Sequence, residues 1–317
     1  MRSFVRVGIV LSLLVALLAL ACSTETAASP TVTVAVPTAT QGIEPTAASL
    51  FPVSVTDSNG NTVVFEKAPE RIVAIDSAVL EILFAMGEGH RVVATHDFVV
   101  YPPEAADIER VGGAFSLNIE KVVELEPDLV FTFFTGPIEA LENAGLKVLY
   151  IESLSNDFTK VADNIRLWGR IVGNPTAAEA VAAEFNQRVA GLNEKMEAID
   201  AGPSIFWDVG GFWTSGPDTL VGEVFTLLKL NNVASDIEGY AQLSPEQIVE
   251  REPEVILALD ASAFLGNPAF DDVAAVRNGR IVSLPFEPGD DPLSVASPRF
   301  VDGIEALARL VYPELFP

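Results

Sequence analysis

The sequence predicts an α/β fold in which two Rossmann-like lobes are joined by a single long α-helix. Three observations lead to this prediction. Short apolar strands alternate with helical segments in both halves of the chain, which is the pattern of parallel βαβ units. The second half repeats the order of the first at a fixed offset, and a long helical stretch lies between the halves.

The N-terminus has the features of a secretory signal peptide, which we assign to residues 1–21. Arg2 and Arg6 flank the start of an apolar run, residues 7–21, that ends in small residues before Cys22. The run is shorter than the roughly 20 residues that a membrane-spanning helix needs, and no charged stop follows it. We therefore expect this segment to be removed.

The residues Leu-Ala-Leu-Ala-Cys at 18–22 resemble the lipobox of bacterial lipoproteins, where the chain is cut before a cysteine that is then lipidated. An ordinary signal peptide with a chance cysteine is the alternative. Cys22 is the only cysteine, so disulfides are excluded, and an unmodified thiol would be open to oxidation in an exported protein. Residues 22–50, rich in Thr, Ala, Val and Pro, are expected to form a flexible tether.

The composition supports folded cores and excludes one class of partner. Hydrophobic residues make up 49% of the chain, and the formal net charge is −25. Loss of Arg2 and Arg6 with the signal peptide makes it −27. A negative field of this size repels nucleic acid, so we expect no nucleic-acid partner.

Residues 51–157 are predicted to form the N-terminal lobe. The alternating stretch that begins at Val53 turns at Asn59-Gly60, which predicts a β-hairpin. Further strands are expected at residues 71–75, 91–95, 129–133 and 147–151, and helices at residues 78–86, 119–125 and 137–144.

Residues 158–199 are predicted to form the inter-lobe helices, and residues 200–317 the C-terminal lobe. Asn174 is expected to cap the second inter-lobe helix, with Pro175 at its first position. At about 24 residues this helix would span roughly 36 Å and limit how far the lobes can hinge. In the C-terminal lobe we expect strands at residues 204–207, 255–259 and 280–284, and helices at residues 220–229 and 245–251.

An offset of 126 residues superimposes residues 117–130 on residues 243–256. Asn118 and Ser244 then occupy equivalent N-cap positions, with Glu120 and Glu246 two residues further on. The helix dipole alone favours an acidic residue there by about 0.3–1 kcal/mol, which is a sufficient structural reason. The functional alternative is a pair of carboxylates, one on each lobe, that meets a partner with two-fold symmetry.

Seven short motifs occur in order through both halves. They are Pro69-Glu-Arg-Ile-Val-Ala-Ile75, Tyr101-Pro-Pro-Glu-Ala105, Asn118-Ile-Glu-Lys-Val with Glu126-Pro-Asp-Leu-Val130, Trp213-Thr-Ser-Gly216, Leu243-Ser-Pro-Glu-Gln247, Val276-Arg-Asn-Gly-Arg280 and Ser297-Pro-Arg299. From about Val53 to its C-terminus the chain resembles the class III solute-binding proteins for iron-siderophores, haem and vitamin B12. The resemblance implies the class III periplasmic-binding-protein fold. It also implies that Glu120 and Glu246 dock onto arginines of an ABC permease dimer, which works with its ATPase.

Aromatic residues lie in the loops that follow the predicted strands, where the cleft of parallel sheets is expected. The resemblance to the B12-binding member of the family implies ligand contacts at Phe98, Phe133, Trp213, Tyr240 and Asp291. Phe115 joins them because it lies in the loop before the first repeated helix. Core packing is the alternative for such aromatics, and we expect it for Phe131 and Phe206, which lie inside strands.

The predicted ligand is a bulky, neutral metal chelate, either a corrinoid such as vitamin B12 or a ferric hydroxamate siderophore. His90 and His96 are the only histidines, so we predict no site for a free metal ion. Arg299 is the only basic residue that we place in the cleft, and it has an alternative structural role near the last helix. A haem-binding member of the class is the alternative, although no tyrosine or histidine is a clear axial ligand.

We expect neither catalysis nor a cofactor, because no Gly-x-Ser-x-Gly, phosphate-binding loop or metal-spaced histidine motif occurs. A cell-surface α/β enzyme without a transport role and a structural lipoprotein are the alternatives, and a ligand titration separates them from transport. The prediction is a monomeric, extracytoplasmic protein, anchored by lipid to the cell membrane on the periplasmic side or at the cell surface.

Overall fold

The computed structural model describes residues 50–152, 157–286 and 290–317. The compact unit to which they belong begins at Ser49. The expected signal peptide, Cys22 and nearly all of the expected tether lie outside the described residues. Within the described ranges, no helix is long and apolar enough to cross a membrane.

The N-terminal lobe is built on a five-stranded parallel sheet with the strand order β5-β4-β3-β8-β9. Along β3, Ile72 and Ala74 face the core shared with helices α1 and α4, whereas Val73 faces the core shared with α2 and α3. Side chains that alternate along a strand point to opposite faces, so the sheet carries helices on both sides. The elements of this lobe are β1 Val53–Thr56, β2 Thr62–Phe65, β3 Ile72–Ala74, α1 Ser77–Ala85, β4 Val92–Thr95, β5 Glu109–Arg110, β6 Gly112–Gly113, β7 Ser116–Leu117, α2 Ile119–Glu124, β8 Leu129–Thr132, α3 Ile138–Asn143 and β9 Val148–Tyr150.

The predicted hairpin is present, since β1 and β2 pair antiparallel around Gly60, whose φ is 85°. The other predicted strands and helices of this lobe begin and end within one residue of their expected bounds.

The C-terminal lobe contains a four-stranded parallel sheet with the order β12-β10-β14-β15. Ile205 and Trp207 face the core shared with α6, and Phe206 between them faces the core shared with α7 and α8. A short antiparallel pair, β11 with β13, adjoins this sheet. The elements are β10 Ser204–Asp208, β11 Trp213–Ser215, α6 Leu220–Leu227, β12 Asn231–Asn232, β13 Tyr240–Gln242, α7 Pro245–Arg251, β14 Val255–Ala258, α8 Ala274–Arg277, β15 Ile281–Val282 and α9 Phe300–Val311.

The sequence repeat is also a structural repeat. Helices α2 and α7 begin at the N-caps Asn118 and Ser244, and each leads into a central strand of its sheet. Between helix and strand, Glu126 and Glu252 adopt φ values of 46° and 45°. A left-handed backbone is uncommon at residues other than glycine. Its presence at both equivalent positions shows that the lobes use the same helix-to-strand turn.

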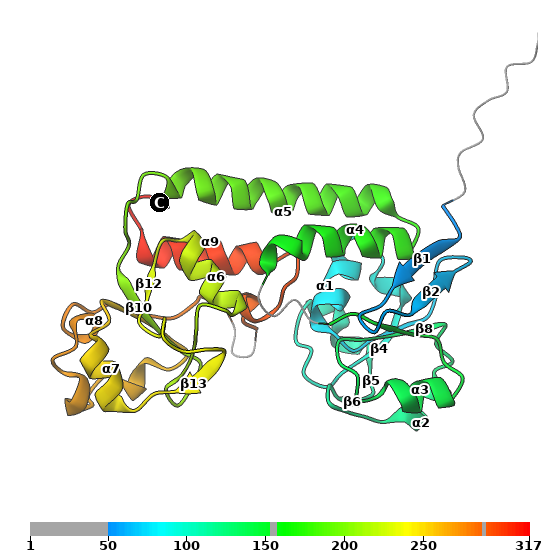
Figure 1. The fold of residues 1–317 in the computed structure, drawn as a ribbon, viewed down its shortest axis with the longest axis horizontal. Coiled ribbons are helices and arrows are strands. Elements are labelled where there is room, and N and C mark those ends of the chain that lie inside the picture. The colour runs from blue at the N-terminus through cyan, green and yellow to red at the C-terminus, as the bar shows by residue number, and fades with distance from the viewer. Residues whose placement is uncertain (1–49, 153–156, 287–289) are drawn as a thin grey trace, which may run out of the picture. The chain divides into compact units, whose positions relative to one another are not determined.

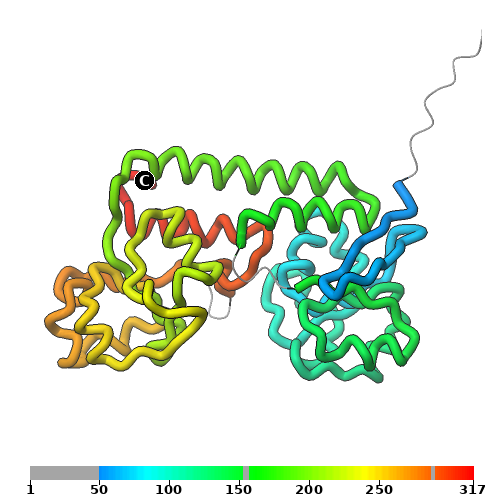
Figure 2. The backbone as a smooth tube through the Cα atoms, viewed as in Figure 1, coloured from blue at the N-terminus to red at the C-terminus, as the bar shows by residue number. Residues whose placement is uncertain are grey.

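Two helices, α4 (Val161–Ile171) and α5 (Pro175–Met196), carry the chain from one lobe to the other, as Figures 1 and 2 show. The long helix α5 ends three residues before its predicted end. Gly169 of α4 is required for the close approach to α5, because a Cβ atom there would lie only 2.2 Å from the Cβ of Ala178. The two-lobed α/β fold with one long connecting helix is therefore confirmed.

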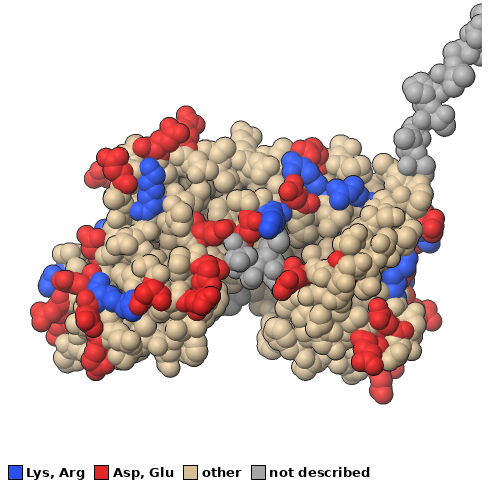
Figure 3. Space-filling view, viewed as in Figure 1, with Lys and Arg blue, Asp and Glu red and all other residues tan. Residues whose placement is uncertain are grey.

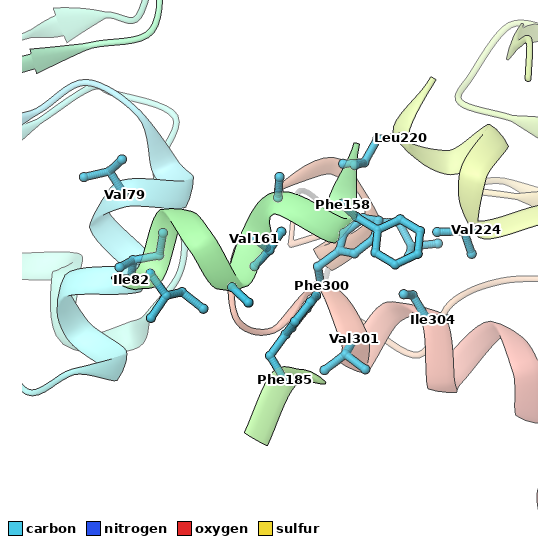
Figure 4. Packing of buried hydrophobic residues seen from close by; sticks show 14 of the residues in the cluster. Val79, Ile82, Phe158, Val161, Phe185, Leu220, Val224, Phe300, Val301 and Ile304 are labelled. Atoms are coloured by element: carbon cyan, nitrogen blue, oxygen red, sulfur yellow. The ribbon is translucent and has the colours of Figure 1, made fainter. Parts of the chain in front are cut away.

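A single hydrophobic cluster runs through both lobes and the helices between them (Figure 4). Ile82 of α1 and Val224 of α6 belong to it, and they come from different lobes. Near its centre the ring of Phe158 packs on the ring of Phe300, with 5.5 Å between the centroids. Because close-packed interiors resist partial displacement, this cluster restrains the lobes against hinging.

Candidate ligand-binding cleft

A pocket of about 300 Å³ lies between the carboxyl edges of the two parallel sheets. Helix α1 and the loop that follows β4 form one wall, the ends of β10 and β14 form the other, and the segment before α9 forms the floor. The lining residues are Ser77, Glu81, Phe98, Val100, Tyr101, Trp207, Val209, Leu259, Asp291, Ser294, Val295 and Arg299. This edge of a parallel sheet is where ligands of α/β proteins bind.

The walls of the pocket are apolar and open to solvent. Phe98 on one wall is 73% exposed, and Leu259 on the other is 67% exposed. Val100 beside Phe98 is exposed as well. Large apolar side chains that gather in solvent around a depression mark a binding surface, so both walls are suited to an apolar ligand face.

Of the six predicted cleft residues, Phe98 and Asp291 line this pocket. Asp291 accepts hydrogen bonds from the N–H of Leu293 and the hydroxyl of Ser294, at 2.9 and 3.0 Å. Burial raises the pKa of the Asp291 carboxyl.

Trp213 and Tyr240 lie on the β11–β13 pair, beside the pocket lining. Trp213 is opposite Gln242 and Tyr240 is opposite Ser215, so the two aromatics are diagonal neighbours on one face. Both side chains are about half exposed. Burial raises the pKa of the Tyr240 hydroxyl, and the charge of Asp291 adds to this effect. The hydroxyl is therefore protonated at neutral pH and can donate a hydrogen bond.

The turn between β10 and β11 sets the position of Trp213. Gly210, Gly211 and Phe212 all have positive φ, with values of 113°, 62° and 65°. The buried carboxylate of Asp208 accepts hydrogen bonds from the N–H groups of Gly210 and Phe212, at 2.9 and 2.8 Å. Positive φ is unfavourable for Phe212, unlike for the two glycines, and these bonds hold the turn in that conformation.

Phe115 and Phe133 lie apart from the pocket lining and pack with each other and with Phe134. Phe115 is 76% exposed, so the cluster presents an aromatic surface on the N-terminal lobe. The core assignment of Phe131 and Phe206 is correct, since both are buried.

Glu81 was not predicted from the sequence as a cleft residue, yet it is the centre of a polar network there. Its carboxylate accepts hydrogen bonds from the hydroxyl of Ser297 and from Nε of Arg299, the latter at 2.9 Å. Arg299 also forms an ion pair with Asp290 and lies over the ring of Tyr101. The available signal was the isolated charge of Glu81 in the otherwise apolar helix α1.

Both nitrogens of the buried His96 ring have partners. Nδ1 accepts the N–H of Phe98 at 3.2 Å, so Nε2 carries the proton and donates to the Ser77 hydroxyl at 3.0 Å. Burial lowers the pKa of His96, with a smaller effect of Arg110. Across the part of the chain that the structure describes, no group of three or more His, Cys, Asp or Glu side chains could hold a metal ion.

Glu120 and Glu246 are exposed in the first turns of α2 and α7, one on each lobe. Hydrogen bonds from its own backbone N–H and from Ser244 hold the pKa of Glu246 below its usual range. Acidic side chains also gather over both lobes on the face that Figure 3 shows. Among the described residues, neither Glu120 nor Glu246 forms an ion pair.

Two equivalent α/β lobes with an apolar pocket at their facing sheet edges define a bilobal solute-binding protein. The chain belongs to the periplasmic binding protein family, whose match covers residues 72–288.

Three known proteins illustrate the similarity. The ABC transporter substrate-binding lipoprotein YvrC of Bacillus subtilis is 29% identical over 84% of this chain and 88% of its own length. A cobalamin-binding protein of Halobacterium salinarum is 27% identical over 93% of this chain and 83% of its own length. The crystal structure of the periplasmic vitamin B12-binding protein of Vibrio cholerae superposes with a TM-score of 0.67 at 27% identity, over 77% of this chain and 96% of that one.

Proposed function

We propose that this protein is an extracytoplasmic solute-binding lipoprotein that captures a metal chelate in the inter-lobe cleft and delivers it to an ABC import permease. The chelate is a corrinoid or a ferric hydroxamate. The observation that carries this proposal is the solvent-open apolar pocket between the equivalent edges of two lobes. The similarity to YvrC and to cobalamin-binding proteins supports the same assignment.

In this proposal the chelate lies against the exposed aromatic and aliphatic walls. It is contacted directly by Phe98, Trp213, Tyr240 and Asp291. The part of the chelate that extends beyond the pocket contacts Phe115 and Phe133. Tyr240 supplies a hydroxyl donor and Asp291 a carboxylate acceptor, which fix the orientation of a ligand held mainly by apolar contact.

The organisation of the whole chain follows from this role. Residues 1–21 are the signal peptide and residues 22–50 the tether. Residues 51–157 and 200–317 are the lobes, and residues 158–199 connect them. Glu120 and Glu246 dock onto the permease, and the protein acts as a monomer without catalysis.

The ligand is identified by native mass spectrometry of the protein purified from its source, followed by titration with cyanocobalamin, a ferric tris-hydroxamate and haem. A bound corrinoid or hydroxamate with a dissociation constant in the micromolar range or below supports the proposal. Tight binding of haem alone would instead assign the protein to the haem-binding members of the same class. A protein that binds none of the three is not a chelate carrier.

Replacing Trp213 with Ala is expected to weaken chelate binding by about 30-fold, because truncating a large aromatic side chain that contacts the ligand costs about 2 kcal/mol or more. Quenching of the remaining tryptophan fluorescence measures the affinity. Leu265→Ala is the matched control, since Leu265 is also an exposed apolar side chain but does not line the pocket. Equal affinities for the Trp213 variant and the control would remove Trp213 from the ligand site.

Replacing Cys22 with Ser is expected to move the protein from the membrane fraction to the soluble fraction, because the serine cannot carry the lipid. Fractionation of cells that express each form measures this. Ser23→Ala keeps the cysteine and is expected to stay with the membrane. A Cys22→Ser protein that sediments with membranes as the wild type does would contradict the anchor.

A further inference from the structure

Arg299 is the only cation that lines the pocket, within the part of the chain that the structure describes. An arginine in a binding cleft ordinarily offers its donors to an anionic ligand. Here the guanidinium is already engaged by other groups. Nε donates to Glu81, Nη2 lies 2.5 Å from a carboxylate oxygen of Asp290, and the group lies 3.8 Å from the centroid of the Tyr101 ring.

Glu81 is the more buried of the two carboxylates that neutralise Arg299, with only 4% of its surface exposed. It belongs to α1 in the N-terminal lobe, whereas Arg299 is the N-cap residue of α9, far along the sequence. The hydroxyl of Ser297 donates a second hydrogen bond to the same carboxylate. Ser297 and Arg299 thus both donate to Oε2 of Glu81, and removing one member of this buried ion pair is costly.

The charges near the floor of the cleft are unbalanced once this pairing is taken into account. Glu81, Asp290 and Asp291 supply three carboxyl groups, and Arg299 supplies one guanidinium. Burial raises the pKa of Glu81, and the hydrogen bond and charge of Arg299 oppose that shift. Among the described residues that line this cleft, an anionic ligand meets carboxylates and no unpaired cation.

We propose that Glu81 determines the charge selectivity of the cleft by neutralising Arg299, so that neutral or cationic chelates enter and anionic chelates are rejected. This inference rests on the proposed chelate-binding function. Glu81 acts through its contact with Arg299 and does not itself bind the ligand. The paired guanidinium then packs against the Tyr101 ring and fixes its position.

The test compares two ferric complexes of similar size that differ in net charge, a neutral tris-hydroxamate and a tris-catecholate of charge −3. Their dissociation constants are measured for the wild type and for Glu81→Gln. Glutamine keeps an oxygen that can accept hydrogen bonds from Ser297 and Arg299, but it removes the charge of the more buried of the two carboxylates that neutralise the guanidinium. The ratio of catecholate to hydroxamate affinity is expected to rise by about tenfold or more, and this gain is expected to fall at high salt.

Two controls isolate the role of Arg299. Glu104→Gln removes one charge beside the neighbouring groove that Arg299 also lines, without an ion pair to Arg299 among the described contacts, and is expected to leave the ratio unchanged. The double variant Glu81→Gln, Arg299→Gln is expected to lose the gain. If Glu81→Gln fails to fold, Asp290→Asn tests the inference from the other side: it leaves Glu81 as the carboxylate that pairs with Arg299, so the ratio is expected to stay close to that of the wild type.

The outcomes separate this inference from the function on which it rests. A folded Glu81→Gln protein with an unchanged ratio overturns the role of Glu81. A gain that persists without Arg299, or an equal gain in Asp290→Asn, also overturns it. A wild type that already prefers the catecholate also overturns it, although chelate capture then stands. A wild type that binds neither complex, nor cyanocobalamin, nor haem, overturns both.

Discussion

The double substitution Glu120→Ala, Glu246→Ala is expected to abolish or sharply reduce stimulation of the transporter's ATPase by the loaded binding protein. The two carboxylates occupy equivalent first turns on the two lobes, so a permease dimer with two equivalent arginines can receive both. Exposed ion pairs contribute only about 0–1 kcal/mol. Charge pairs that are desolvated in an interface cost about 2–5 kcal/mol when one partner is removed, so losing both is expected to weaken docking at least about 100-fold.

ATPase activity in proteoliposomes that contain the permease, measured at increasing concentrations of binding protein, tests this expectation. The repeat supplies the matched control, Glu124→Ala with Glu250→Ala. These two glutamates are also 126 residues apart and exposed on the same helices, but they lie beyond the first turn. Chelate affinity is expected to stay unchanged in both double variants. Loss of chelate affinity with normal docking would move Glu120 and Glu246 into the ligand site.

The fold could be predicted because its determinants are local. The Asn59-Gly60 turn, the alternation of apolar strands with helices and the shared helix caps at Asn118 and Ser244 are visible in short windows of sequence. The β11–β13 pair could not be predicted in this way. It joins Trp213 to Gln242, and pairing of such short strands depends on the surrounding packing more than on propensity.

Some residues of the candidate site could also be predicted from the sequence, and others could not. Phe98 and Asp291 were predicted as ligand contacts from the resemblance to the B12-binding member of the family, and both line the pocket. Glu81 and Leu259 could not be assigned. The role of Glu81 depends on its hydrogen bond with Arg299, which lies 218 residues further along the chain. Leu259 lies at the end of a strand, and its place in the pocket becomes visible only when the facing lobe is known. Contacts between lobes are decided by tertiary packing, which single-sequence patterns do not contain.

Replacing Phe300 with Ala is expected to destabilise the protein by about 3–5 kcal/mol and to lower the Tm by about 10 °C. Phe300 is completely buried, packs on Phe158, and belongs to a hydrophobic cluster that extends through both lobes. Its truncation leaves a cavity in the region that couples them. Because the cluster is continuous, the wild type is expected to unfold in a single cooperative transition rather than lobe by lobe.

Differential scanning calorimetry of the wild type and of three variants measures both expectations. Phe300→Leu keeps most of the apolar volume and is expected to lose less stability than the Ala variant. Phe98→Ala is the control for ring removal, since Phe98 is 73% exposed and its loss is expected to change stability by no more than about 0.5 kcal/mol. Two resolved transitions in the wild type would show that the lobes unfold independently. A Phe300→Ala protein as stable as the Phe98→Ala control would show that this ring does not hold the lobes together.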